Sequence, residues 1–411
     1  MEIRPILSAL MRSKTGAVLL ALQVALSLAI LVNALYIVNV RQAAAQRPSG
    51  VADESAIFAV ILDNLKPGGV NQQLAIGQRI TASLRALAGV ASVANARQLP
   101  LSGSGMIGSL RTEPGQARTE INASTYASPD SLVQTWGLKL IAGRDFRPDE
   151  VIDVDRNDDD ALPQVLIVTR ALAEKAWPGA ASVLGKTVYF GSDAKAATAR
   201  VVGVVAALQT PNAEADARAE YSLLMPIRHL GGHGAIYTVR TEPGQRERVM
   251  REVDAALRAA AVGPLVVRTE TMQEQRAKRY RADLALSWML IGVSALLLLV
   301  TASGIVGISS LWVAQRRKQI GVRRALGARR IDILRYFITE NILITSAGVA
   351  AGALLALALN ELLVSQLELG RLPPAYIGAG AAVFWALGLA AVYGPAWRAA
   401  SISPASATRG A

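Results

Sequence analysis

Cysteine is absent from the 411 residues, and histidine is almost absent, with two copies only. Without cysteine the chain can form neither disulfides nor thiolate metal sites. The two histidines, His229 and His233, lie four residues apart in HLGGH. The two glycines between them disfavour the helix that a metal-binding pair would need. We therefore interpret this stretch as a loop and predict no metal site.

Charge is also scarce, at 18% of residues, against about a quarter in a typical soluble domain. Apolar residues are instead collected in four uncharged runs, at 15–40, 284–315, 341–360 and 372–397. Each run reaches the length of about 20 residues that a membrane span needs. The pattern predicts a membrane protein with four transmembrane α-helices and a large mixed α/β extracytoplasmic domain between the first and second.

The four runs lack carboxylates and lysines. Charged side chains inside spans usually mark ion or proton paths. We therefore expect spans without a polar interior, which disfavours an ion-driven transporter. The first run is too long for the apolar core of a cleavable signal peptide, so we expect an uncleaved anchor.

Orientation follows from the basic residues. Thirteen lysines and arginines lie in the leader, in the link at 316–335 and in the tail, against Glu2 and Asp332 alone. Because basic connections stay in the cytoplasm, this excess indicates topology and no nucleic-acid binding. The predicted division is a cytoplasmic amphipathic leader (1–14), transmembrane helices at 15–40, 284–315, 341–360 and 372–397, a periplasmic domain (41–283), a cytoplasmic coupling segment (316–340), a short periplasmic loop (361–371) and a cytoplasmic tail (398–411).

Three stretches imitate ligand-binding motifs. Gly185-Lys186-Thr187 ends like a phosphate-binding loop, but Ala180 stands where that loop needs glycine. Residues 101–105, LSGSG, imitate the signature loop of an ABC-type ATPase, without the rest of an ATPase site around them. The aspartate run at 153–160 lacks the glycine and the glutamate of an EF-hand loop. We predict a structural turn at GKT, a solvated acidic loop at 153–160, and no catalytic, cofactor or metal residue.

Within the predicted α/β domain, the patterns indicate strands at 55–62, 164–169, 199–208 and 234–241. They indicate helices at 71–87, 169–177 and 245–261.

The link at 316–340 is cationic and amphipathic. Its apolar residues can share one side of short helical segments: Ile320, Leu326, Ile331, Leu334 and Phe337. Its arginines 323, 324, 329 and 330 face elsewhere, and Gly321 and Gly327 permit breaks. Such a segment suits an anionic lipid surface or a groove on a partner protein. In the third run, Gly348 and Gly352 have the spacing that allows close helix packing.

Several stretches resemble one family. The most specific is QRRKQIGVRRALGARRIDILRYFITENIL at 315–343, followed by GPAWRAASISPASATRG at 394–410. The α/β domain adds 128–146, 168–188 with its WPG…LGK pattern, and VVGVV at 201–205. With the order of the spans, these resemble the permease subunits of MacB/FtsX/LolCE-type ABC transporters, the mechanotransmission class (type VII). Gln315, Gln319 and Ser406 stand where the family commonly has glutamate, which argues against local salt bridges that shape the link and favours an asymmetric partner subunit.

The resemblance implies a permease without a fused ATPase domain in the bacterial inner membrane, with both termini in the cytoplasm. ATP and magnesium would be bound by a separate cytoplasmic ABC ATPase dimer, and a second permease, identical or homologous, would complete the assembly. A periplasmic adaptor and an outer-membrane channel are further implied partners, for efflux of peptides, toxins or antibiotics. Lipoprotein extraction and FtsX-like regulation of a cell-wall hydrolase, or peptide sensing, remain alternatives. The residues implied in contact with the ATPase are Gln319, Ile320, Gly321, Arg323, Arg324, Ala325, Leu326, Gly327, Ala328, Arg329 and Arg330.

Overall fold

The computed structural model describes residues 14–63, 69–114, 120–155, 161–191, 197–230, 234–260, 265–367 and 370–401. The chain forms two compact units: Met1–Gln42 with Asp283–Ala411, called here the helical unit, and Ala43–Ala282, the α/β domain. The predicted leader, the tail beyond residue 401, His233 and residues 156–160 of the acidic run lie outside the described residues.

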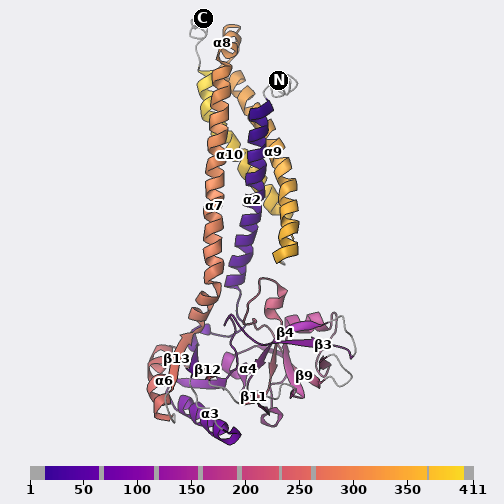
Figure 1. Ribbon diagram of the computed structural model, residues 1–411, viewed down its shortest axis with the longest axis vertical. Helices are drawn as coiled ribbons and strands as arrows, with labels where there is room; N and C mark the ends of the chain where they lie inside the picture. Colours follow the sequence, from indigo (N-terminus) through magenta and orange to yellow (C-terminus); the bar gives the residue numbers. More distant parts are fainter. Residues whose placement is uncertain are drawn as a thin grey trace. The chain divides into compact units, whose positions relative to one another are not determined.

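Within the described residues, four helices are long and apolar enough to cross a membrane. They are α2 (Lys14–Gln46), α7 (Met272–Gln315), α9 (Arg330–Leu367) and α10 (Pro374–Ala400), drawn as the long coiled ribbons of Figure 1. The short helix α8 (Arg317–Ala325) lies between α7 and α9 in the chain. The chain is thus a membrane protein with four such helices and an α/β domain between the first and the second, as the sequence predicts.

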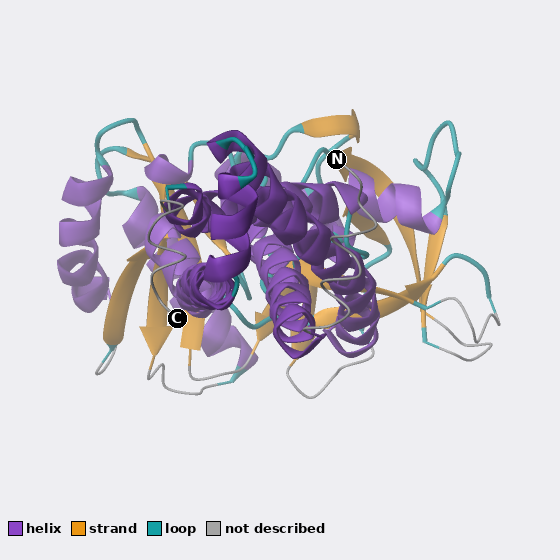
Figure 2. Ribbon diagram, turned by 90° about the horizontal axis from the view of Figure 1, so that it is seen from above, coloured by secondary structure: helices purple, strands orange, loops and turns teal. Residues whose placement is uncertain are grey.

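Helix α2 is the centre of the helical unit. Its most apolar window is 56% buried, against 17%, 33% and 28% for those of α7, α9 and α10. One core cluster joins Val24 and Leu28 of α2 to Val349 of α9 and Phe384 of α10. Figure 2 looks down on these helices and shows them side by side.

The expected absence of a polar interior is wrong for this unit. Ser27 of α2 lies 2.9 Å from the hydroxyl of Thr301 in α7. The Asn33 amide donates to the Ala356 carbonyl of α9 at 3.1 Å, and the Gln23 amide donates to the Val300 carbonyl at 3.0 Å. Where lipid surrounds a bundle, such bonds tie helices together, since lipid offers the polar groups no partner. The sequence shows these side chains but not that they point inward.

One four-stranded sheet takes its strands from both the start and the end of the α/β domain, and we call it, with its two helices, the split unit. Its strands are β1 (Ile57–Asp63), β2 (Val90–Asn95), β12 (Gly234–Thr241) and β13 (Val266–Thr271), in the sheet order β13-β1-β12-β2. Helix α3 (Val70–Arg85) follows β1, and α6 (Arg246–Ala260) follows β12. This is the β-α-β-β-α-β arrangement of ferredoxin-like units, here with a long insertion between β2 and β12. Its core of apolar side chains includes Ile80 and Leu84 of α3 and Val249 and Val253 of α6.

The insertion is built around a second sheet. Its order is β5 (Leu140–Gly143), β9 (Ala197–Val205), β7 (Val165–Thr169), β10 (Ser222–Met225), β4 (Ile121–Ala127), β3 (Ile107–Arg111) and β8 (Thr187–Phe190). Because β8 also pairs with β9, the pairing closes into a ring with β5 beside it. Strands β6 (Ile152–Asp155) and β11 (Ile227–Leu230) form a separate parallel pair, and α4 (Leu132–Trp136) and α5 (Arg170–Ala176) complete the insertion. The described part of the domain also contains the 3-10 turns η1 (Glu54–Ala56), η2 (Pro148–Glu150) and η3 (Ala217–Glu220).

A buried tryptophan joins the insertion to the split unit. Trp136 of α4 is 1% exposed, and its indole N–H donates to the Thr238 hydroxyl of β12 at 3.1 Å. Its ring meets that of Tyr126 edge-on, with centroids 5.3 Å apart. A tryptophan buried with its N–H satisfied is a strong packing anchor. The two parts of the domain therefore share a core.

The sequence patterns locate these elements well. The predicted strands correspond to β1, β7, β9 and β12, and the predicted helices to α3, α5 and α6, with bounds that differ by no more than three residues. The structural turn predicted at GKT is confirmed: Gly185 has φ +81°, and β8 begins at Thr187. Lys186 lies over the Trp177 ring, 5.4 Å from its centroid.

Candidate coupling surface and the two ends of helix α7

Helix α8 has sharply defined ends. A single residue, Arg316, separates it from α7, and the Ile320 N–H donates to the Arg316 carbonyl at 2.9 Å. At its other end Gly327 has φ +97°, and the N–H groups of Gly327 and Ala328 return to the carbonyls of Arg324 and Arg323. This is a Schellman cap, which favours glycine at that position. The break predicted at Gly327 is therefore present.

The start of α9 fixes the same connection between α8 and α9 from its C-terminal side. Asp332 accepts the Arg329 N–H at 2.9 Å, as the third residue of a capping box does. The short sequence LGARRID thus sets the geometry between α8 and α9.

One side of α8 packs into the helical unit. Ile320 and Gly321 are buried. The cluster around Ile320 consists of Ile333, Leu334 and Phe337 of α9 and Ala396, Ala399 and Ala400 of α10. Arg324 donates to the Ala400 carbonyl at 3.1 Å, where a cation suits the C-terminal end of α10.

The other side of α8 carries exposed apolar residues among cations. Leu326 is 83% exposed, Val322 54% and Ile331 46%. We call these three residues, with the exposed residues Gln319, Arg323, Ala325, Gly327, Arg329 and Arg330, the α8 surface. Ala328 is half-buried beside the cluster around Ile320. Large apolar side chains exposed in this way are typical of a surface that is covered by a partner or by lipid.

Three details of the predicted link are wrong. Leu326 and Ile331 do not share the packed side with Ile320. Leu326 is the C-cap residue of α8, six residues after Ile320 and about 240° further around the helix, and Gly327 redirects the chain before Ile331. Gly321 makes no break, since it is buried within α8. Arg324 does not face away from the packed side, because it caps α10.

A buried ion pair joins the start of α8 to α9. The Arg316 guanidinium donates to both Glu340 oxygens, at 3.0 and 2.8 Å, and the Glu340 side chain is 1% exposed. The guanidinium also lies 5.9 Å from the ring centroids of Trp312 and Tyr336. A salt bridge does shape this link, but its carboxylate comes from α9 and not from the positions of Gln315 and Gln319, where the sequence argued against local salt bridges.

Sequence reasoning missed this pair because Glu340 stands just outside the predicted third run. A usable signal existed: Glu340 is the single acid between Asp332 and Glu361, at the edge of an apolar run. A lone carboxylate at that position needs a cation.

Gly348 and Gly352 lie against α2. A Cβ on Gly348 would come within 2.8 Å of the Ala21 carbonyl oxygen, and one on Gly352 within 2.9 Å of the Ala25 carbonyl oxygen. These two positions therefore tolerate no side chain without movement of one helix.

The opposite end of α7 lies in the α/β domain, where Arg276 binds the chain that leaves α2. Its guanidinium donates to the carbonyls of Ala45 and Arg47 at 3.0 and 2.9 Å and to the Glu54 carboxylate at 2.6 Å. Both charged side chains are 23% exposed. One side chain of α7 thereby holds the last turn of α2 and the segment that follows it.

Two further arginines bind the segment at 207–216. Arg47 donates to the carbonyls of Glu214, Ala215 and Asp216, and Arg279 of α7 donates to that of Asn212. Gln209 donates back to the Arg47 and Pro48 carbonyls. We call residues 43–50, 207–216 and 272–280 the collar.

Backbone strain is concentrated in and beside the collar. In the described ranges the non-glycine residues with left-handed φ are Asp53, Leu101 and Ala213, at 49°, 64° and 46°. Leu101 and Ala213 are buried in one cluster with Ala44 and Tyr280, and Asp53 precedes the Arg276 partner Glu54. Such conformations persist only where the surroundings enforce them, and they concentrate at functional sites.

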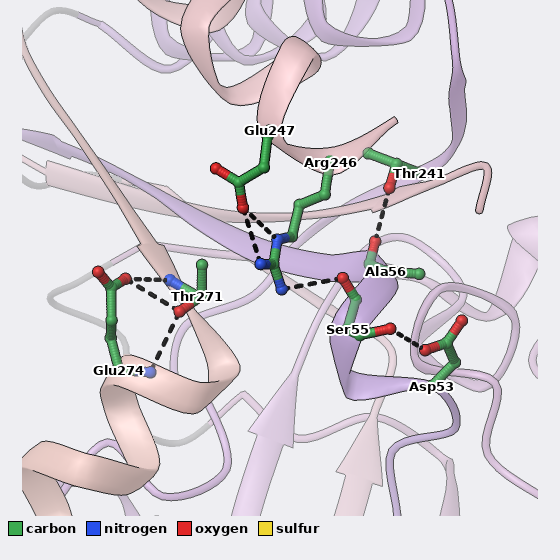
Figure 3. A network of polar contacts seen from close by, with 8 residues as sticks. All are labelled: Asp53, Ser55, Ala56, Thr241, Arg246, Glu247, Thr271 and Glu274. Atoms are coloured by element: carbon green, nitrogen blue, oxygen red, sulfur yellow. Dashed lines mark hydrogen bonds and ion pairs between the residues drawn. The ribbon is translucent and has the colours of Figure 1, made fainter. Parts of the chain in front are cut away.

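Figure 3 shows the residues that fix the first turn of α7, which is part of the collar. Thr271 and Glu274 form a reciprocal capping box: the Glu274 carboxylate accepts the Thr271 N–H at 2.7 Å, and the Thr271 hydroxyl accepts the Glu274 N–H at 3.1 Å. The Thr271 N–H and the Thr271 hydroxyl both donate to the Glu274 carboxylate and lower its pKa. Arg246 pairs with Glu247 and donates to the Ser55 carbonyl. The start of α7 is thus fixed by capping as well as by Arg276.

Comparisons with known proteins cover these elements. Residues 291–404 match the family model described as the FtsX-like permease C-terminal domain. The chain is 26% identical over 318 residues to the macrolide export ATP-binding/permease protein MacB of Chromobacterium violaceum, covering 75% of this chain and 47% of the relative. It is 39% identical over 130 residues to the pyoverdine export ATP-binding/permease protein PvdT of Pseudomonas syringae pv. tomato, covering 31% of this chain and 19% of the relative.

The chain therefore spans less than half the length of these curated relatives. Among solved structures, the extracellular domain of the noncanonic ABC-type transporter YknZ from Gram-positive bacteria matches 51% of this chain and 99% of its own, with 15% identity and a TM-score of 0.31.

Proposed function

Because the chain is a MacB/FtsX-like permease, we propose that it transmits ATP-driven motion from a separate cytoplasmic ATPase to its α/β domain. In this proposal the ATPase dimer docks on the α8 surface and holds the ATP and magnesium. The chain itself performs no hydrolysis. A second permease, identical or homologous, completes the assembly in the bacterial inner membrane, with both termini in the cytoplasm.

The observation that carries the proposal is the continuity of α7. This helix runs unbroken from Met272, in the collar, to Gln315, and only Arg316 separates it from α8. Its 44 residues correspond to about 66 Å at the rise of an α-helix. A helix held at both ends can carry a displacement from one end to the other, and Arg316 and Arg276 hold the two ends.

Cargo follows from the relatives, which are named for export of macrolides and pyoverdine. We propose efflux of peptides, toxins, antibiotics or related secreted compounds, met by the α/β domain on the periplasmic side. A periplasmic adaptor and an outer-membrane channel would then continue the route.

The test is co-purification of the ATPase with altered permease. The double variant Leu326→Ser/Arg329→Glu removes an exposed apolar contact and reverses one cation on the α8 surface. Loss of two contacts worth about 1.4 kcal/mol together would weaken association about tenfold, and co-purified ATPase should fall accordingly. Transport in cells should fall with it.

Arg398→Glu is the matched control. Arg398 is exposed at the end of α10, outside the α8 surface, and its reversal changes the net charge by the same amount. Equal loss of ATPase in both variants would assign the effect to altered membrane topology, and no loss in either would refute docking at α8.

A further inference from the structure

A cleft in the α/β domain has no part in the coupling described above. Two cavities of about 420 Å³ each share Asn95, His229, Leu230, Gly234 and Ala235 as lining residues. Their walls come from α3, β2 and β12 of the split unit and from β4 and β11 of the insertion. Junctions between two substructures are common positions for small-molecule sites, and each volume falls within their usual range.

Helix α3 gives the first cavity an apolar wall. Leu74, Ile76 and Ile80 line it, together with Gly77. A Cβ on Gly77 would meet nothing closer than the Tyr237 hydroxyl, at 3.8 Å. The missing side chain therefore leaves space that a ligand can fill, and a larger residue would fit there without a backbone clash.

The carboxylates of the cleft are already neutralised. Asp130 receives Arg85 at 3.1 Å and the Asn95 N–H at 2.9 Å. Asp63 receives Arg268 at 2.7 Å. Beside them Tyr237 stays protonated, because burial raises its pKa to about 12. No negative charge of these side chains is thus left to hold a cation.

Arginines supply the opposite charge. Arg97 lines the second cavity and donates to the ring nitrogen Nδ1 of His229 at 2.8 Å. Within the described part of the chain, no carboxylate forms an ion pair with Arg97. Arg228, which lines the first cavity, pairs with Asp153 at the edge and keeps its side chain 41% exposed. Because the two cavities share five lining residues, a ligand that spans both would meet Arg97 in the second and the apolar wall of α3 in the first. An arginine can bind a planar anionic group through two parallel N–H bonds.

We propose that this cleft binds small amphipathic carboxylates, with the anionic group at Arg97 and the apolar part against α3. The assignment deepens the proposed function, since it gives the class of molecule that the α/β domain would meet. Its test measures binding alone, so its failure would leave the ATPase co-purification result standing.

The experiment uses the full chain in lipid nanodiscs and two fluorescent probes. Dansylglycine carries an aromatic group and a carboxylate, while dansylamide carries the same aromatic group without the charge. Empty nanodiscs report partition of each probe into lipid. The expected result is saturable binding of dansylglycine, at least about tenfold tighter than that of dansylamide, as one charge-assisted contact would give.

Two variants locate the site. Gly77→Leu fills the apolar wall and should weaken both probes about tenfold or more, since it removes the space for their shared group. Arg97→Glu should weaken dansylglycine by a similar factor and leave dansylamide within about twofold. Arg79→Glu is the matched control: it lies on α3, is exposed and does not line either cavity. Circular dichroism checks that each variant is folded.

Non-saturable signals, or binding that survives both Gly77→Leu and Arg97→Glu, would overturn the site. Equal affinity for the two probes would overturn the assignment to carboxylates. Loss in Arg79→Glu as large as in Arg97→Glu would show a general charge effect and would also overturn it.

Discussion

The two ends of α7 are built in opposite ways. In the collar, Arg276, Arg47 and Arg279 donate their N–H groups to carbonyls and one carboxylate. The side chain of Tyr280 is buried there in one cluster with Leu101. At α8, the arginines around Leu326 are mostly exposed, and Leu326 itself is 83% exposed. The collar, whose arginines bond to groups of the same chain, is suited to fixing one end of α7. The α8 end, whose arginines and leucine are exposed, is suited to binding a partner protein.

The α8 end of α7 also contains a buried ion pair that binds the chain to itself. The Arg316–Glu340 pair is buried, unlike the arginines of the α8 surface. Buried, paired residues and exposed residues thus occur together at the α8 end. Single substitutions can separate the effects of the two kinds of residue.

The largest effect is expected at Arg316→Ala. Breaking a buried pair from one side leaves an uncompensated charge and costs about 3–5 kcal/mol. Glu340→Gln keeps a polar partner and should cost less. The double variant Arg316→Ala/Glu340→Gln should resemble Glu340→Gln alone, because no bare carboxylate remains.

Thermal unfolding in detergent, followed by circular dichroism, measures these changes. Arg317→Ala is the control, since Arg317 is exposed one residue away, and it should change stability by less than about 0.5 kcal/mol. Additive losses in the double variant would show that Arg316 and Glu340 act separately.

The sequence predicted where the helices and strands lie, but it did not predict which way individual side chains point. Runs of apolar residues determine where spans lie, and alternation determines where strands lie, because both patterns are local. Whether Ile331 packs or is exposed depends on the single left-handed residue Gly327, which redirects every residue after it. The pattern predicted a break there but not its consequence for Ile331.

Long-range pairs were beyond the sequence for a related reason. Arg276 meets Glu54 across 222 positions, and nothing in the local pattern of either residue distinguishes it from other exposed charges. The glycines 348 and 352 carried a usable local pattern, but the helix that they face, α2, was not predictable from it.

The second largest effect is expected at Arg276→Ala. The change removes the Arg276 donor from the Ala45 and Arg47 carbonyls and from the Glu54 carboxylate. Gln209 still donates to the Arg47 carbonyl and Ser49 to Glu54, so the expected cost is that of the lost charged bonds, about 2–3 kcal/mol. Local opening of the collar should rise correspondingly, so amide hydrogen exchange in residues 207–216 and 272–280 should accelerate by about 30- to 150-fold.

Arg281→Ala is the control for the collar, because Arg281 is an exposed arginine on the same helix. Unchanged exchange in Arg276→Ala would mean that the collar is held by its apolar cluster alone. Faster exchange confined to the collar, with normal global unfolding, would identify Arg276 as a local clamp.

A third ion pair, Arg144–Glu150, lies outside both ends of α7. The dependence of stability on pH can measure its contribution. Arg144 binds Glu150 through both carboxylate oxygens and, with the Arg147 N–H, lowers the pKa of Glu150 to about 2. A depressed carboxylate pKa stabilises the fold above the pKa of the unfolded chain, near 4.5, and this stabilisation is lost as pH falls toward 2.

After allowance for solvent screening, the loss should be about 1–2 kcal/mol. Glu150→Gln should remove that part of the acid dependence and lower stability at pH 7, as measured by urea unfolding of the chain at a series of pH values. A variant with the same stability difference at pH 7 and at pH 2 would exclude Glu150 as the source.

The smallest stability effect is expected at Leu326→Ala. The side chain is 83% exposed and packs against no core cluster of the described residues, so its truncation should change unfolding by less than about 0.5 kcal/mol. Ile320→Ala, one helix face away and 5% exposed, should cost about 2–5 kcal/mol, because it empties a packed position. The informative result is the pair of readouts: Leu326→Ala should keep its unfolding temperature and lose co-purified ATPase, whereas Ile320→Ala should lose both. If Leu326→Ala kept the ATPase as well, the exposed leucine would contact lipid and the docking contribution would have to come from the arginines of the α8 surface.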